Sequence, residues 1–145
     1  MTSQTKPANQ RAIDFQSDLA ELAKLREFCS DVFSLACPNR DVREDDKFIN
    51  VQLALNEACA NVMEHGYDFV PEQPIRCVAS WDDKQLCFHI EHEGKAFVEP
   101  EQIAQIDRPL EGGMGLFLIQ QCVDQVQYCQ TDSGRQCIRL FITIP

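Results

Sequence analysis

The sequence predicts an α+β fold, a two-layer α/β sandwich in which helices cover one face of a sheet. Apolar residues recur at helical spacing in two segments of the N-terminal half. Two pairs of shorter apolar segments follow, each pair separated by turn residues, which predicts antiparallel hairpins. Helices that precede paired strands are typical of this fold class.

The N-terminal half carries both strong helical patterns. Arg11 to Phe15 are expected to form a short edge strand. Ser17 is the expected N-cap of a first helix that ends at Cys37, before proline. A second helical pattern runs from Asp45 through His65, and Gly66 is its stop signal.

The C-terminal half carries the strands and a loop-rich segment at 92–113. The expected elements are strands at Ile75–Trp81 and Gln85–Glu91, a short helix near Glu101–Ile106, a helix at Gly115–Val123, and strands at Val126–Cys129 and Cys137–Ile144. Asp82-Asp83 suits the turn of the first hairpin, and Asp132-Ser133-Gly134 suits the turn of the second.

Length and charge limit the classes of function. At 145 residues the chain has the size of one domain, expected at 11–145 after a disordered polar tail at 1–10. A formal charge of −10 argues against nucleic acid as a partner, because phosphate backbones are bound by clustered Lys and Arg. The sequence has no apolar run long enough to span a bilayer and no secretory signal, which predicts a cytoplasmic protein without a membrane partner.

Eight cysteines raise the question of zinc or disulfides. They occur without a CxxC pair, whereas structural zinc sites usually show closely paired ligands. Most of them have apolar neighbours in the sequence. We therefore expect reduced, buried cysteines that pack as small apolar residues, with thiolate metal binding as the alternative.

The second helix carries a polar ridge beside its apolar stripe. Glu57, Asn61 and His65 fall within an arc of roughly 80° on an ideal helix. An amide oxygen one turn from a carboxylate suits Mg²⁺ chemistry, since the amide can ligate the ion while the carboxylate orients or deprotonates a nucleophile. A solvated flank of the helix is the alternative interpretation of the same pattern.

Two glycine-containing segments follow the ridge. Gly112-Gly113-Met114-Gly115-Leu116 joins a loop to a helix, where free N–H groups and the helix dipole favour phosphate. A simple helix-entry turn is the alternative. Gly94 follows a strand directly and can mark a turn of either kind.

The order and spacing of these motifs resemble the GHKL superfamily of ATPases, and within it the anti-sigma-factor serine kinase branch. The resemblance covers residues 11–145. It is most specific at the ExxxNxxxHGY pattern that starts at Glu57, and at GMGL in 113–116. It implies a Bergerat-type ATPase fold with a mixed, mostly antiparallel sheet.

The resemblance also implies roles for individual residues. Glu57 would be the catalytic base, and Asn61 would ligate the magnesium of ATP. Gly94 would lie beside the adenine, and the amides of Gly113 and Gly115 would contact phosphates. The other residues expected in the nucleotide site are His65, His92, Arg108, Met114 and Leu116.

Relatives of this kind form homodimers that bind a sigma factor. They also phosphorylate a serine of an anti-anti-sigma (STAS-type) protein. The resemblance therefore implies ATP and Mg²⁺ as cofactors and a role in transcription regulation.

The chain departs from the family pattern at the adenine end. His92 stands where the family usually has the Asp that accepts the adenine amino proton, and Arg135 stands where a Thr is common. Arg108 is the only cation in the expected lid. Two functions remain open: a serine/threonine kinase that is also an anti-sigma factor, and a non-catalytic GHKL-fold binding module with weak or no ATP binding.

Overall fold

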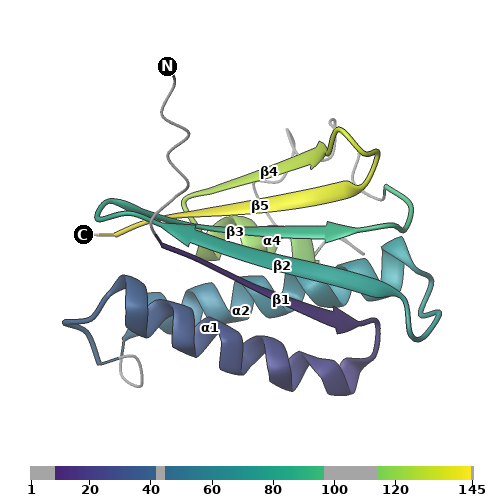
Figure 1. Ribbon diagram of the computed structural model, residues 1–145. Helices are drawn as coiled ribbons and strands as arrows, with labels where there is room; N and C mark the ends of the chain where they lie inside the picture. Colours follow the sequence, from purple (N-terminus) through teal and green to yellow (C-terminus); the bar gives the residue numbers. More distant parts are fainter. Residues whose placement is uncertain (1–8, 42–44, 97–113, 145) are drawn as a thin grey trace.

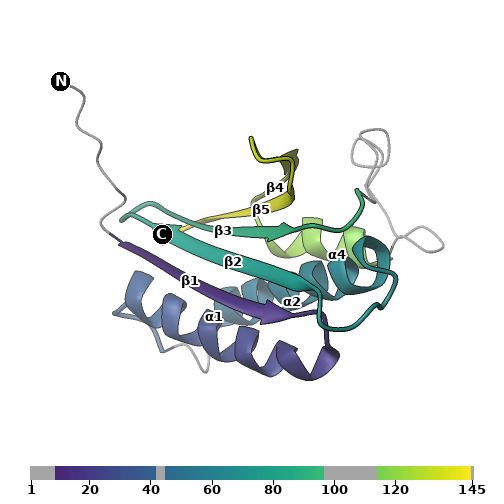
Figure 2. The ribbon, with the colours of Figure 1, turned by 45° about the vertical axis from the view of Figure 1, so that its right-hand side comes forward.

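The computed structural model describes residues 9–41, 45–96 and 114–144 and confirms the two-layer α+β fold. The helices α1 (Leu22–Ala36), α2 (Asp46–Asn61) and α4 (Met114–Cys122) lie on one side of the sheet (Figures 1 and 2). The strands are β1 (Asn9–Gln16), β2 (Pro74–Trp81), β3 (Gln85–His92), β4 (Gln125–Gln130) and β5 (Gln136–Thr143). Their order is β1-β2-β3-β5-β4, and each described pairing is antiparallel, so the expected mixed sheet is not found among these strands.

Alternation along the strands places the core between the sheet and the helices. In the central strand β3, Leu86, Phe88 and Ile90 are fully buried, whereas the intervening His89 and Glu91 are only half-buried. The predicted apolar stripe of the second helix is confirmed, because its members are buried against this face: Phe48, Val51, Leu55, Cys59 and Val62. Strand period and helix period therefore bury complementary surfaces.

The start of the chain differs from the prediction in two places. The first strand begins at Asn9, so the last two residues of the expected tail pair with β2. Ser17 is not the helix cap. It is buried, and its hydroxyl donates to Val70 O and accepts from Gln73 N. Asp18 caps the short 3₁₀ turn η1 (Leu19–Glu21) that leads into α1, because its carboxylate accepts from the N–H of Ala20.

The second helix begins as expected and ends differently. Asp45 is its N-cap, and the carboxylate accepts from the N–H groups of Lys47 and Phe48. The α-helix ends at Asn61 and continues as a π-helical turn, η2 (Val62–Gly66). The prediction of an α-helix through His65 is therefore wrong for the last turn. Side-chain periodicity does not reveal this change, since a single π-helical turn of five residues is too short to establish a period of its own.

The cysteine prediction is wrong for one pair. Cys129 and Cys137 form a disulfide between β4 and β5. The other six cysteines are free thiols, and four of these are buried. The disulfide requires two strands in one particular register, which the spacing of cysteines in the sequence does not reveal.

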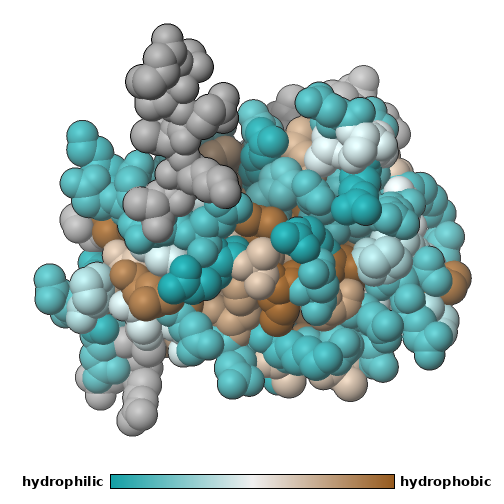
Figure 3. All heavy atoms as spheres, viewed as in Figure 1, coloured by the Kyte–Doolittle hydropathy of each residue, from teal (hydrophilic) through white to brown (hydrophobic). Residues whose placement is uncertain are grey.

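A groove lies between β1 and α1, with a volume of about 490 Å³. Ala12, Phe28, Val32 and Leu35 give it an apolar lining. Figure 3 shows apolar surface in the middle of the face where β1 and α1 lie side by side in Figure 1. Of the helices within the described ranges, none combines the length and the apolar character needed to cross a bilayer.

Candidate functional site

Two motifs that lie far apart in the sequence meet at the end of the second helix. Gly94, in the turn after β3, lies against Gly66 at the end of η2, and the N–H of Lys95 donates to Gly66 O at 2.9 Å. A Cβ atom on residue 94 would lie 2.3 Å from that oxygen, a distance that real Cβ atoms do not adopt. Gly94 is therefore required by this close approach of two backbones.

Tyr67 bonds through its hydroxyl to the segments on both sides of this contact between Gly66 and Gly94, which we call the junction. Its hydroxyl donates to Pro74 O at 2.6 Å and accepts from the N–H of Glu93 at 2.7 Å. Burial raises the pKa of this phenol, so the hydroxyl keeps its proton at neutral pH. One side chain thus connects the end of η2 to the start of β2 and the end of β3.

His92 lies at the centre of the junction. Only 2% of its surface is exposed, its ring packs edge-to-face on Tyr67, and Gly66 leaves room for it. The N–H of Gly94 donates to Nδ1 at 3.2 Å, and burial lowers the pKa of His92 to about 4. The imidazole is therefore neutral at pH 7, with its proton on Nε2. Nε2 is therefore a hydrogen-bond donor, whereas the aspartate that the family pattern predicts at this position could only accept.

A cavity of about 160 Å³ opens beside His92. Tyr128, Gln130, Gln136 and Ile138 contribute to its walls from the hairpin of β4 and β5. Burial raises the pKa of Tyr128 to about 12. Pockets that enclose a drug-sized ligand measure roughly 300–1,000 Å³, so this cavity has room for only one part of such a ligand.

The predicted ridge is divided by the π-helical turn. Asn61 is the last residue of α2 and is 8% exposed, and Glu57 lies one turn earlier and is half-buried. His65 lies beyond Asn61 in the π-helical turn, about half exposed, with Nε2 3.3 Å from Glu64. Glu57 and Asn61 therefore keep the helical spacing on which the prediction depends. None of these three residues lines the cavity beside His92.

The expected phosphate segment starts a helix that packs on the ridge helix. α4 begins at Met114, one residue before the predicted start, and lies against α2 (Figure 2). Gly115 and Leu116 thus belong to its first turn. Gly113, Arg108 and the short helix expected at Glu101–Ile106 lie outside the described residues.

A comparison with protein families finds a match over most of the chain. The model described as the histidine kinase-like ATPase domain matches residues 15–142, a span that contains both glycine motifs and the ridge. The chain belongs to this family. Its two-layer architecture agrees with that assignment.

This histidine kinase-like ATPase domain is also similar to a curated protein, the serine-protein kinase RsbW of Bacillus licheniformis. The two are 27% identical over 100 residues, which cover 61% of each chain. The chain thus matches less than two thirds of the length of that relative.

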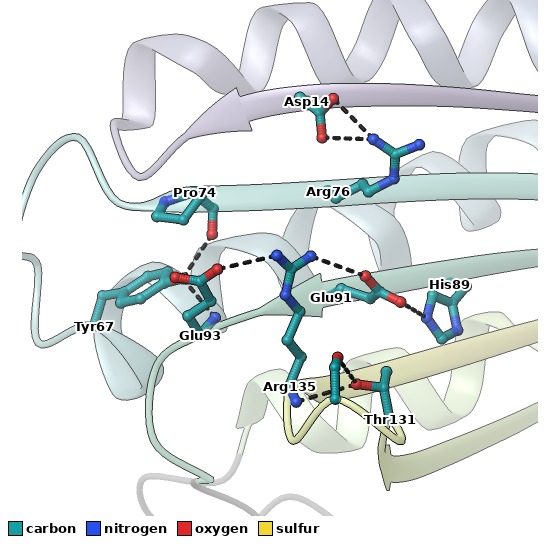
Figure 4. A network of polar contacts seen from close by, with 10 residues as sticks. Asp14, Tyr67, Pro74, Arg76, His89, Glu91, Glu93, Thr131 and Arg135 are labelled. Carbon is teal, nitrogen blue, oxygen red and sulfur yellow. Dashed lines mark hydrogen bonds and ion pairs between the residues drawn. The ribbon is translucent and has the colours of Figure 1, made fainter.

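Arg135 lies beside the end of β3 in this ATPase domain. Its guanidinium pairs with Glu93 at 3.2 Å and with Glu91 at 3.6 Å (Figure 4). It does not line the 160 Å³ cavity, but it lines a second hollow of about 300 Å³ that His92 also borders. The side chain therefore ties the tip of the last hairpin to the end of β3. Sequence reasoning missed this role, because the pairing of β3 with β5 across the sheet decides it.

The residues of this ATPase domain fit the phosphate and magnesium end of a nucleotide. Mg²⁺ is usually held by one or two protein oxygens together with phosphates and water. Asn61 can supply such an oxygen next to Glu57, although no cluster of three or more His, Cys, Asp or Glu occurs in the described ranges. The N-terminus of α4 suits phosphate. His92, by contrast, offers a donor at Nε2 in the place where the sequence pattern predicts a carboxylate that accepts from adenine.

Proposed function

We propose that this chain is an ATP-dependent serine kinase and an anti-sigma factor. The observation that carries the proposal is the junction of Gly66 with Gly94, because it joins the ridge helix to the predicted base-side turn. The likeness to a serine-protein kinase supports the same activity. Bound Mg-ATP would supply the phosphoryl group.

The ridge residues have distinct roles in this proposal. The amide oxygen of Asn61 holds the magnesium ion. Glu57, half-buried one turn away, accepts the proton of the attacking serine hydroxyl. The N–H groups at the start of α4 and Gly113 hold phosphate, with Arg108 as the lid cation and His65, Met114 and Leu116 around the nucleotide.

The proposed partners follow from the same likeness. A serine of an anti-anti-sigma protein is the substrate, and a sigma factor is the sequestered ligand. A homodimer in the cytoplasm is the proposed working form. The net charge of −10 favours partner surfaces that carry lysine and arginine.

Thermal stability in the presence of nucleotide tests the binding step. Mg-ATP at a hundred times its dissociation constant should add about 2.7 kcal/mol to the free energy of unfolding. ATP with a chelator should add less, and Asn61→Ala should remove this magnesium-dependent difference. Wild-type protein without any stabilisation by millimolar Mg-ATP would overturn the proposal.

Phosphotransfer tests the role of Glu57. Glu57→Gln should keep Mg-ATP binding and lose transfer to the anti-anti-sigma protein by a factor of roughly 10² or more, since it removes the general base. Glu64→Gln is the matched control, because this exposed carboxylate lies in the π-helical turn that follows the same helix. An unchanged transfer rate in Glu57→Gln would exclude its role as a base.

A non-catalytic binding module is the second candidate, and His92 favours it. A neutral ring whose Nδ1 already accepts from Gly94 does not accept an adenine amino proton through that atom. An aspartate there can accept from both groups. His92→Asp should therefore raise the affinity for Mg-ATP roughly tenfold if lost base recognition weakens binding. Unchanged or lower affinity in this variant, with wild-type binding intact, would contradict that explanation.

A further inference from the structure

Cys129 and Cys137 occupy a special place in the sheet. They lie directly opposite each other in the register of β4 and β5, with a Cα–Cα distance of 5.1 Å, and form a disulfide. This separation lies inside the range that disulfides require, and ordinary strand pairing provides it. The sheet can therefore hold the pair as a disulfide or as two thiols in the same register.

We propose that Cys129 and Cys137 are a reversible modification site, oxidised by low-molecular-weight disulfides and reduced by dithiols, which controls the cavity beside His92. Both cysteines line that cavity. Their neighbours along the two strands complete the same wall: Tyr128, Gln130, Gln136 and Ile138.

The position of β4 explains why the bond matters there. β4 is an edge strand of the described sheet, and each of its residues is half-buried or exposed. Backbone pairing with β5 holds it, and the disulfide is a covalent link across that pair. Reduction therefore loosens one wall of the cavity, whereas oxidation fixes it.

Three of the six free thiols lie too deep in the core to provide an equivalent site. Cys29, Cys59 and Cys77 are fully buried in the core, and burial raises the pKa of each thiol. Their thiolate forms are therefore disfavoured, and thiolate is the reactive species. Cys129 is half-buried, so a small disulfide can reach it more readily than the buried Cys137.

The exchange proceeds in two steps. The Cys129 thiolate attacks one sulfur of the small disulfide RS–SR, forms a mixed disulfide and releases RS⁻, which takes up a proton. The Cys137 thiolate then attacks Sγ of Cys129 and expels the second RS⁻, which is protonated in turn. Two protein thiols lose two electrons and two protons, and one RS–SR becomes two RSH.

Alkylation in glutathione buffers tests the modification. Protein equilibrated at graded ratios of reduced to oxidised glutathione is treated with iodoacetamide, digested with trypsin and analysed by mass spectrometry. Cleavage after Arg135 and Arg139 places Cys137 on the peptide 136–139, apart from Cys129. We expect these two residues to become linked and unlinked reversibly across the glutathione range. A pair that never links, or that glutathione never reduces, would overturn the proposal.

Two variants separate this site from general thiol chemistry. Cys129→Ser should abolish the link to peptide 136–139. Cys87→Ser is the matched control, because Cys87 is another half-buried thiol and lies on β3, the other neighbour of β5. It should leave the link and its midpoint unchanged. An identical response of both variants would refute the assignment.

Control of the cavity has its own measurement. Amide hydrogen exchange in 126–130 should slow roughly tenfold or more on oxidation of the wild type and stay constant in Cys129→Ser. This readout needs no ligand, and equal exchange in both redox states would refute control of the wall.

A further readout uses Mg-ATP and rests on the proposed function. The oxidised form should bind it roughly three- to tenfold more tightly, because the wall is already ordered. Absence of Mg-ATP binding in both states would count against the proposed function alone. Equal affinities would count against this inference alone.

Discussion

His92 changes the acid response of the molecule through its burial. Its pKa falls from 6.5 to about 4 on folding, because the ring leaves water without gaining a carboxylate. The folded state thus binds fewer protons than the unfolded state between these values. The stabilisation of the neutral ring is complete above pH 6.5 and is lost as the pH falls toward 4.

This difference between the folded and unfolded pKa of His92 predicts a measurable pH dependence of stability. Between pH 7.5 and 4.5 the wild type should lose about 2–3 kcal/mol more of its unfolding free energy than His92→Gln, which has no titrating ring. Urea unfolding of both proteins at the two pH values gives the difference. Equal losses in the wild type and His92→Gln would contradict the buried, neutral state.

The connections between elements depend on few polar atoms, and the Tyr67 hydroxyl is one of them. Tyr67→Phe removes both of its bonds and leaves Pro74 O and the N–H of Glu93 without this partner. We expect a loss of about 1–3 kcal/mol in unfolding free energy, measured by urea denaturation without ligand.

The second tyrosine provides the control for this prediction. Tyr128→Phe removes the same group from the cavity wall, and the hydroxyl of Tyr128 makes neither of the two backbone bonds that Tyr67 makes. It should cost clearly less than Tyr67→Phe. A loss of equal size in both variants would show that the junction of η2 with β2 and β3 is not what Tyr67 stabilises.

The sequence predicted the elements more reliably than their ends. Apolar periodicity located both helices and both hairpins because burial imposes it. It did not reveal that Ser17 bonds to the loop at Val70, or that the helix widens into a π-helical turn after Asn61. These details depend on residues distant in the chain: Ser17 meets Val70 and Gln73, and Gly66 meets His92.

In the candidate site too, contacts within one helix could be predicted from the sequence, whereas contacts between elements could not. Glu57 and Asn61 could be placed together because one helical turn separates them. The contact of Gly66 with Gly94, the disulfide and the Arg135 pairs depend on how sheet and helices dock. A motif in the sequence gives the residue types of such a site, whereas the tertiary fold sets which of them touch.

The two layers share one apolar core, so the whole domain should unfold in a single step. Buried residues of the sheet and the helices form one contiguous cluster in the described structure. Trp81, the sole tryptophan of the sequence, is 9% exposed in β2, and its fluorescence therefore reports on the sheet. In reducing buffer its urea transition should coincide with that of far-UV circular dichroism, which the helices dominate.

A substitution in one layer should then affect both signals equally. Leu55→Ala, at a fully buried position in α2, should lower the unfolding free energy by about 2–5 kcal/mol with the same shift in fluorescence and dichroism. Leu53→Ala on the same helix, 43% exposed, should move both by less than about 1 kcal/mol. If Leu55→Ala shifts the dichroism midpoint and leaves the Trp81 midpoint in place, the layers unfold separately. Sheet and helices would then not form one cooperative unit around the site.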